Sequence, residues 1–290
     1  MKTYRVPEIA RKYVEYDMIQ EHAVLPELAN ARLRLLYACL SQQQSLQTHS
    51  ELYTLVVSLV QLGMDTHDLI DTRQDQRSET EMRARQLKVL AGDYFSASFY
   101  QLLAQAGQIQ MIASISSAVS EVNRLKVNLY VRMRQHKLTA DEYLNLSVSI
   151  KSTLFHVFSE MLEGTLSRVW PEILNGLSLC ETLAEELANI GTAEQRYDQG
   201  WPYWHYMQAA TDEERHQISK HANEHAFIQS LAEKYKVRSQ LSSKLQQSAD
   251  QVLSAVRLLE SDELIGELTD IVNSLLPEKT DYTPALNETR

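Results

Sequence analysis

The chain consists of long stretches that mix hydrophobic and polar residues without Gly or Pro, separated by short signals of the kind that begin helices. Pro7 and Pro26 suit the first turn of a helix. Residues 139–142 (TADE) and 211–214 (TDEE) have the spacing of capping boxes, in which Thr and Glu satisfy each other's free amides. The pattern predicts helices near residues 7–21, 25–45, 49–73, 80–106, 109–136, 140–163, 171–190, 193–200, 212–236 and 238–275.

The predicted helix at 49–73 differs from the others. Residues 52–60 are apolar on nearly every side, which is typical of a helix at the centre of its fold. The second half is polar, and because successive helical residues are about 100° apart, His67, Asp68 and Asp71 share one face. An apolar helix that ends in carboxylates indicates either a metal and phosphate site or a solvated helix end.

Composition narrows the fold class. Gly (8) and Pro (6) together number 14 of 290 residues, which is about 5% against roughly 12% on average. Scarce turn residues argue against a barrel, a sandwich or a disordered chain, so we expect an all-α protein. No internal repeat or long polar linker divides the chain, which predicts one helical domain over 1–276 and a flexible tail over 277–290.

Charge, cysteine content and hydrophobicity exclude several kinds of partner, site and location. The net charge of −10 repels the phosphate backbone of nucleic acids. The isolated Cys39 and Cys180 form neither a disulfide framework nor a CxxC metal site. The longest apolar run, residues 55–64, is too short to span a bilayer, and the charged N-terminus does not resemble a signal peptide. We therefore expect a cytoplasmic protein without a transmembrane segment.

Several elements resemble trans-prenyl diphosphate synthases in order and spacing. Residues 89–94 (VLAGDY) resemble an element of that family, and residues 66–71 (THDLID) lie where the family carries HDDxxD. Residues 76–77 (QR) lie at the position of its paired arginines, and residues 151–155 (KSTLF) at that of its lysine–threonine element. Residues 191–198 keep the GxxxQxxD spacing that opens its second aspartate motif.

The resemblance implies an isoprenoid-synthase-like helical bundle, because these all-α enzymes extend an allylic diphosphate with isopentenyl diphosphate. It also implies remnant diphosphate or metal positions at Asp68, Asp71, Arg77, Lys151 and Asp198. These side chains either hold a remnant diphosphate pocket or only satisfy one another across the helix ends.

The departures from the family pattern bear on activity. His67 replaces the leading aspartate of the first motif, while Gln199 and Pro202 replace two aspartates of the second. Arg32 and Arg34 keep only part of the family's GGKRxRP element. Mg²⁺ is a hard ion held by carboxylates and phosphate oxygens, and three of the family's six motif carboxylates are absent. One unit charge lost at about 4 Å is worth about 4 kcal/mol at an effective dielectric constant of about 20, roughly a thousandfold in rate.

We therefore expect that this chain alone has no catalytic residue and binds no metal or other cofactor. Residues 62–73 (LGMDTHDLIDTR) and 85–104 resemble the first component of bacterial two-component heptaprenyl or hexaprenyl diphosphate synthases. That resemblance implies a catalytic partner with intact DDxxD motifs and Mg²⁺. It also implies that this chain sets product length when farnesyl and isopentenyl diphosphate are condensed for the menaquinone side chain. Two alternatives stay open: an autonomous prenyl synthase whose atypical metal site includes His67, and a helical scaffold without prenyl chemistry.

The residues before the first motif are candidates for a product-length wall. Leu59, Leu62 and Gly63 lie one and two turns before His67. In the resembled family the prenyl chain runs down between helices from this point, so we expect these residues to border a tunnel shared with the partner. Gly63 either leaves room there for a long product or simply permits close helix packing.

Two further features have plainer alternatives. Residues 221–225 (HANEH) match the zinc-protease string HxxEH, but a solvated helix face is the expected interpretation. The aromatic stretch at 197–207 fills the vacant second motif, contacts a partner or packs in the core.

Overall fold

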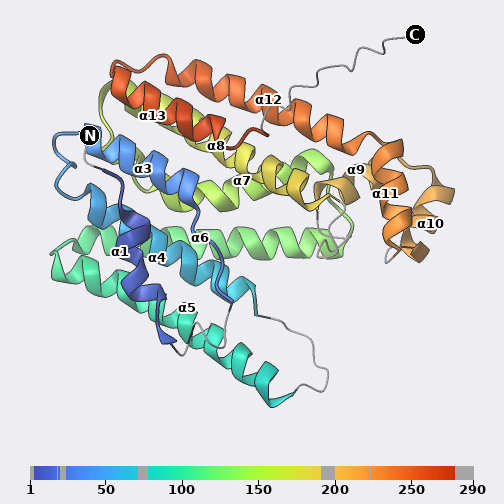
Figure 1. Ribbon diagram of the computed structural model, residues 1–290, viewed down its shortest axis with the longest axis horizontal. Helices are drawn as coiled ribbons and strands as arrows, with labels where there is room; N and C mark the ends of the chain where they lie inside the picture. Colours follow the sequence, from blue (N-terminus) through green and yellow to red (C-terminus); the bar gives the residue numbers. More distant parts are fainter. Residues whose placement is uncertain are drawn as a thin grey trace, which may run out of the picture.

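The computed structural model describes residues 3–17, 19, 24–70, 78–190, 200–221 and 224–277. All regular secondary structure in these residues is helical (Figure 1). The helices are α1 (Val6–Val14), α3 (Asn30–Gln42), α4 (Ser50–Asp68), α5 (Glu79–Gln105), α6 (Ile109–Arg134), α7 (Ala140–His156), the 3₁₀ turn η1 (Ser159–Met161), α8 (Gly164–Asn189), α9 (Trp201–Ala209), α10 (Asp212–His221), α11 (His225–Lys234), α12 (Val237–Val256) and α13 (Asp262–Asn273). No helix in this part of the chain is long and apolar enough to cross a membrane.

The helices form a bundle in which α3 is central (Figure 1). Helix α3 packs against α4, α8 and α13. On one side of it lie α4, α5 and α6, with an extensive contact between α4 and α5, and α1 packs on α4. On the other side α8 packs along α12, while α7 contacts α6, α8 and α9. Helices α9, α10 and α11 gather at one end of the bundle (Figure 1).

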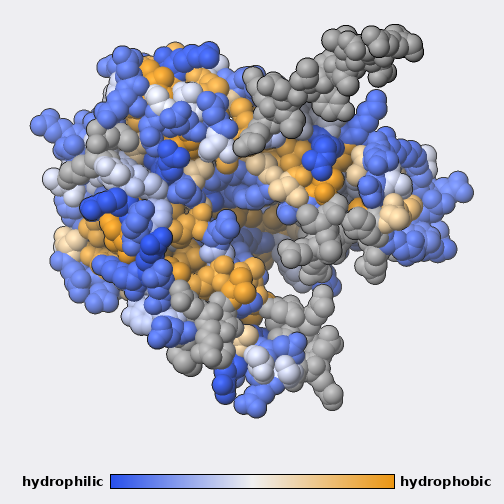
Figure 2. Space-filling view, viewed as in Figure 1, coloured by the Kyte–Doolittle hydropathy of each residue, from blue (hydrophilic) through white to orange (hydrophobic). Residues whose placement is uncertain are grey.

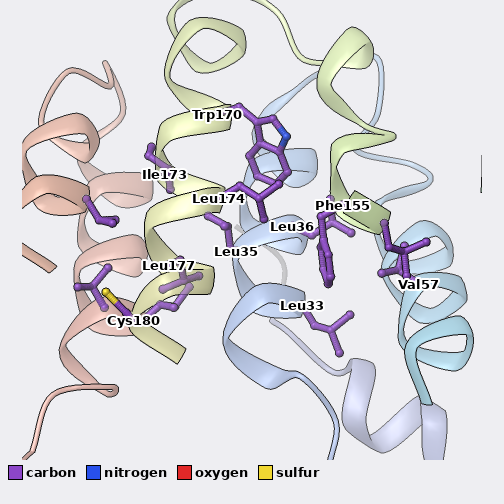
Figure 3. Close-up of a cluster of buried hydrophobic side chains, with 14 of the residues drawn as sticks. Leu33, Leu35, Leu36, Val57, Phe155, Trp170, Ile173, Leu174, Leu177 and Cys180 are labelled. Carbon is purple, nitrogen blue, oxygen red and sulfur yellow. The ribbon is translucent and has the colours of Figure 1, made fainter. Parts of the chain in front are cut away.

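The core forms where apolar side chains from α3, α7 and α8 meet (Figure 3). Leu33, Leu35 and Leu36 of α3, Phe155 of α7 and Trp170 of α8 are almost fully buried. Burying one Leu or Phe side chain contributes about 1.5–3 kcal/mol. This packing therefore sets the relative positions of the helices that carry the candidate site.

The prediction of a buried helix at 52–60 is confirmed, since every residue from Tyr53 to Met64 of α4 is buried. Polar side chains are tolerated there because they bond to the helix itself. The Ser58 hydroxyl, for example, donates to the carbonyl of Leu55 at 2.7 Å.

Both predicted capping boxes are confirmed. At the start of α7, Thr139 Oγ1 accepts from the backbone N–H of Glu142, and the Glu142 carboxylate accepts from the N–H of Thr139. Thr211 and Glu214 make the same exchange at the start of α10. Pro7 lies in the first turn of α1, as predicted.

Two predicted helix starts are wrong. Pro26 precedes α3, which begins only at Asn30. Helix α8 begins at Gly164, so Pro171 lies inside it and not in its first turn. Pro171 has no backbone N–H and therefore removes one hydrogen bond from the preceding helical turn. The turn stays helical because Trp170 is buried in the core, and this burial outweighs the loss of the hydrogen bond.

Three predicted helices are each divided. The helix predicted at 140–163 ends as α7 at His156 and is followed by the 3₁₀ turn η1. The helix predicted at 238–275 is split into α12 and α13, where the Ser261 hydroxyl caps the second helix by accepting from the amide of Leu264. The helix predicted at 212–236 is split into α10 and α11. The helix predicted at 193–200 and the predicted tail, from residue 278 onward, lie outside the described residues except for Gly200.

Candidate functional site

The acidic end of α4 is paired with α6. Helix α4 ends at Asp68, whose Oδ2 lies 2.5 Å from the Nζ of Lys126. The Lys126 side chain is 21% exposed and that of Asp68 is 55% exposed, so the carboxylate end of this ion pair is open to solvent. The aspartate retained from the resembled first motif is thus held by a cation of the same chain. Asp71, Arg77 and Asp198, which the resemblance also singled out, lie outside the described residues.

His67 packs against the VLAGDY element on α5. Its Nε2 lies 3.5 Å from Oδ1 of Asp93. A Cβ placed on Gly92 would lie 2.6 Å from that same nitrogen, far inside van der Waals contact. In its present position the imidazole therefore requires a glycine at position 92, a dependence that the spacing of the motif does not reveal.

The sequence pattern did not single out Asp65, a half-buried carboxylate one turn before Asp68. Its Oδ1 accepts a hydrogen bond from Nε2 of Gln61 at 2.8 Å. Burial raises the pKa of Asp65, while the bond from Gln61 and the charges of Lys126 and Arg32 oppose part of that rise. The sequence signal that could have identified Asp65 is its position three residues before Asp68, which places both carboxylates near one face of the helix.

A buried ion pair joins α3 to α8. Arg32 Nε donates to Oε2 of Glu181 at 2.5 Å, and Arg32 Nη1 donates to the backbone carbonyl of Lys151 at 2.6 Å. The side chains of Arg32 and Glu181 are only 6% and 10% exposed. The guanidinium also lies over the Phe155 ring, 5.1 Å from its centroid. Arg32 is therefore held by this chain's own groups through both Nε and Nη1.

Lys151, which resembles a diphosphate-contacting lysine, is also paired with α8. Its Nζ lies 2.5 Å from Oε1 of Glu185. The Lys151 side chain is 17% exposed and that of Glu185 is 61% exposed. The sequence pattern did not single out Glu181 or Glu185, although a spacing of four residues places them on one face of a helix.

Glu186 joins three helices close to the start of α9. The Tyr143 hydroxyl donates to its Oε1 at 2.9 Å, and the backbone N–H of Trp201 bonds to the same carboxylate. The backbone at Gly200 passes so close that a Cβ there would lie 2.7 Å from Oε2 of Glu186. Burial raises the pKa of Glu186. Helix α9 is thus anchored beside the region of the resembled second motif.

The predicted product-length wall faces helices of the same chain. Leu59 and Leu62 are buried in a small cluster that α1, α4 and α5 form around Phe95. A Cβ on Gly63 would lie 3.0 Å from Oγ of Ser96 on α5, so this glycine permits the close approach of α4 and α5. The border with a prenyl tunnel stays a prediction.

The zinc-like string and the aromatic stretch have structural roles. His221 Nδ1 lies 2.8 Å from Oε1 of Glu224 on the molecular surface. No group of three His, Cys, Asp or Glu side chains in the described part of the chain could hold a metal ion. Trp201 and Trp204 are each 1% exposed, and Trp201 stacks on His205 with ring centroids 4.7 Å apart. The described part of the aromatic stretch therefore packs in the core.

Comparison with known proteins identifies a family whose sequence pattern this chain matches. A family described as heptaprenyl diphosphate synthase (HEPPP synthase) subunit 1 matches residues 16–225. Heptaprenyl diphosphate synthase component 1 from Geobacillus stearothermophilus is 39% identical over 83 residues. That match covers 29% of this chain and 36% of the relative, so the chain aligns with only about a third of the relative's length.

Solved structures share the fold at low sequence identity. A decaprenyl diphosphate synthase from Rhodobacter capsulatus is 16% identical, with a TM-score of 0.69 over 93% of this chain and 94% of that one. A polyprenyl synthase from Caulobacter crescentus, complexed with calcium and isoprenyl diphosphate, is 14% identical, with a TM-score of 0.70 over 93% and 92% of the two chains. The predicted all-α, isoprenoid-synthase-like bundle is thus confirmed. Because the family match extends over residues 16–225, more than two thirds of the sequence, the chain belongs to the heptaprenyl diphosphate synthase subunit 1 family.

Proposed function

We propose that this chain is the regulatory, product-length-determining subunit of a two-component heptaprenyl diphosphate synthase and has no turnover alone. Its partner is the component that carries intact DDxxD motifs and binds Mg²⁺. Together they condense farnesyl diphosphate with isopentenyl diphosphate for the menaquinone side chain, and we place the complex in the cytoplasm. Family membership supports the subunit role. The observation that carries the lack of turnover is the ion pair between Asp68 and Lys126.

The chemistry of the reaction makes this pairing significant. Mg²⁺ neutralises a diphosphate leaving group, a task for which the metal needs oxygen ligands. Asp68 Oδ2 already lies 2.5 Å from the Lys126 ammonium, so a metal ion would have to displace the lysine. At the leading motif position His67 offers an imidazole nitrogen, and its ring is confined against Gly92. These features support a metal site on the partner.

The partner surface in this proposal lies on the neighbouring helices α5 and α6. Among the described residues, eight of the twelve exposed large hydrophobic side chains belong to these two helices. We call the following eight residues the α5–α6 surface: Met82, Val89, Leu90, Tyr100, Ile109, Val127, Tyr130 and Val131. Figure 2 shows apolar side chains reaching the surface in the half of the molecule that contains α4, α5 and α6. Such a concentration supports contact with another protein.

Product length, in this proposal, is set through α4. Leu59, Leu62 and Gly63 border the path of the growing prenyl chain, and Gly63 also sets how closely α5 approaches α4. Because α5 carries half of the α5–α6 surface, displacement of α5 changes the fit of the partner. A substitution on α4 therefore changes the shape of the tunnel directly, and it also changes the tunnel indirectly by altering the contact between the subunits.

A reconstitution assay tests the proposed function. Farnesyl diphosphate, labelled isopentenyl diphosphate and Mg²⁺ are supplied to this chain alone, to the DDxxD-bearing component alone and to the mixture. We expect a long product from the mixture only. Turnover by this chain alone would identify an autonomous synthase instead. If the rate and product length of the partner do not change when this chain is added, the chain is better assigned as a helical scaffold without prenyl chemistry.

A further inference from the structure

Three ion pairs join the helices around the candidate site. In each of them the nitrogen and oxygen atoms lie 2.5 Å apart. The pairs are Asp68–Lys126 between α4 and α6, Arg32–Glu181 between α3 and α8, and Lys151–Glu185 between α7 and α8.

The pairs lie in one neighbourhood. Arg32 Nη1 donates to the backbone carbonyl of Lys151 at 2.6 Å, so the pair made by Arg32 adjoins the pair made by Lys151. The charges of Lys126 and Arg32 both act on the half-buried carboxylate of Asp65, which links the pair on α4 to the pair on α3. The three pairs therefore form one connected set of charges.

The pairs balance charge without any ligand. A site that takes a divalent cation and a diphosphate keeps carboxylates free for the metal and cations free for the anion. Here the Lys126 ammonium neutralises Asp68, and carboxylates of α8 hold Arg32 and Lys151. Three cations and three carboxylates cancel one another within the fold.

We propose that the three ion pairs take the place of a metal ion and a diphosphate, so that they fix α3, α4, α6, α7 and α8 around the site and exclude both ligands. This inference rests on the proposed function, which places the metal site on the partner, and on the resemblance that marks Asp68 and Lys151 as remnant positions. Burial makes the central pair costly to break, because separating Arg32 from Glu181 would leave two buried charges unpaired. An entering diphosphate would have to displace the carboxylates of Glu181 and Glu185.

Binding of inorganic pyrophosphate to the full chain tests the inference. Calorimetry and thermal unfolding are measured with pyrophosphate, with Mg²⁺ and with both. We expect no binding and no shift in Tm for the wild type. The double variant E181Q/E185Q frees both cations and gains pyrophosphate affinity by at least about tenfold. Adding K151Q to the double variant removes most of that gain, which places the binding at this site.

Glu172→Gln provides the matched control, because it removes the same charge from an exposed residue of the same helix. Its pyrophosphate affinity equals that of the wild type. If the double variant does not fold, E185Q alone replaces it, since this glutamate is 61% exposed, and it shows a smaller gain in the same direction. A folded variant that gains nothing over E172Q overturns the inference.

The wild type gives a second decisive outcome. Pyrophosphate or Mg²⁺ binding that raises the Tm of the wild-type chain as much as that of the variant contradicts the inference. If such a chain still has no turnover without its partner, the proposed function stands. Turnover by the chain alone, in the reconstitution assay, contradicts the proposed function itself, so the two failures are distinguishable.

Discussion

Two glycines control the contact between α4 and α5. A Cβ on Gly92 would meet the His67 ring at 2.6 Å, and a Cβ on Gly63 would meet Ser96 Oγ at 3.0 Å. The first contact is with the end of a side chain that is 37% exposed and can turn aside. The second is accompanied by the backbone carbonyl oxygen of Gly92, which would lie 3.1 Å from the same Cβ and cannot turn aside. Position 63 is therefore the more restrictive of the two.

Gly92→Ala is expected to destabilise the protein by about 1 kcal/mol, because the new methyl group forces the His67 ring out of its present rotamer. Urea unfolding measures the change. The double variant H67A/G92A should recover most of the loss, since the clashing ring is then absent. Equal losses in the single and double variants would show that the clash involves other atoms.

Gly266→Ala is the control for helix propensity. A Cβ at Gly266 of α13 meets no atom within 4 Å. Replacing a helical Gly by Ala in open space stabilises a helix by up to about 1 kcal/mol. The same substitution should therefore stabilise the protein at 266 and destabilise it at 92, as measured by the same unfolding experiment.

The buried carboxylate of Glu186 makes stability depend on pH. Its pKa is raised above the ordinary value of 4.5, mainly by burial, so the folded chain keeps this proton at pH values where the unfolded chain has lost it. The resulting stabilisation is complete below the unfolded pKa and is lost as the pH rises through the folded pKa. Hydrogen bonds from Tyr143 and Trp201 stabilise the charged carboxylate and limit the rise in its pKa.

Glu186→Gln removes this titration and keeps an oxygen acceptor for the Tyr143 hydroxyl. We expect the stability of the wild type relative to E186Q to fall as the pH rises from about 4 to about 8. Urea unfolding of both proteins across that range measures the difference, in which contributions from Asp65 and other groups cancel. Parallel stability curves would mean that Glu186 has the same pKa in both states.

Among the helices, α4 has two roles: it is part of the core, and it carries charged residues of the candidate site. Its residues from Tyr53 to Met64 are buried on all sides, and its last turn presents Asp65 and Asp68 to Arg32 and Lys126 of other helices. A change inside α4 therefore displaces both its neighbours and the charged end. Product length, if α4 sets it, should respond to substitutions along the face toward α5.

Gly63→Phe should shorten the product of the assembled synthase, because the ring fills space on α4 and pushes α5 outward. Product chain length by chromatography is the measurement, and Gly63→Ala should give a smaller effect in the same direction. Circular dichroism and co-elution with the partner establish that each variant folds and assembles. An unchanged length in a folded, assembled G63F complex would contradict the role of α4.

At the scale of the whole molecule, the α5–α6 surface leads to a prediction about assembly. Tyr130→Glu places a charge among exposed apolar side chains of α6 and should weaken binding to the DDxxD-bearing component by about 2 kcal/mol, roughly 30-fold. Surface plasmon resonance measures the affinity. Leu258→Glu is the matched control, since Leu258 is also exposed but lies between α12 and α13, two helices that pack on α8 and α3. Equal effects of the two substitutions would place the contact elsewhere.

Much of the fold was predictable because its signals are local. The capping box at 139–142 and the apolar stretch at 52–60 involve residues within a turn or two of each other, and both are confirmed. The start of α8 was mispredicted because burial of Trp170 supports a turn that Pro171 weakens. Local rules fail where distant packing supplies the larger share of the free energy.

The sequence by itself determined the helical class, the buried α4 and the order of motifs that led to the family. Only the tertiary structure decided how the charges of the site are satisfied. Asp68 and Lys126 are 58 residues apart in the chain, and Arg32 and Glu181 are 149 apart. Which charge meets which across such separations depends on how the helices pack, and in the buried Arg32–Glu181 pair the loss of either partner would leave an uncompensated charge in the core. Residue types and spacings therefore indicated a site, whereas packing decided that its charges are paired with one another.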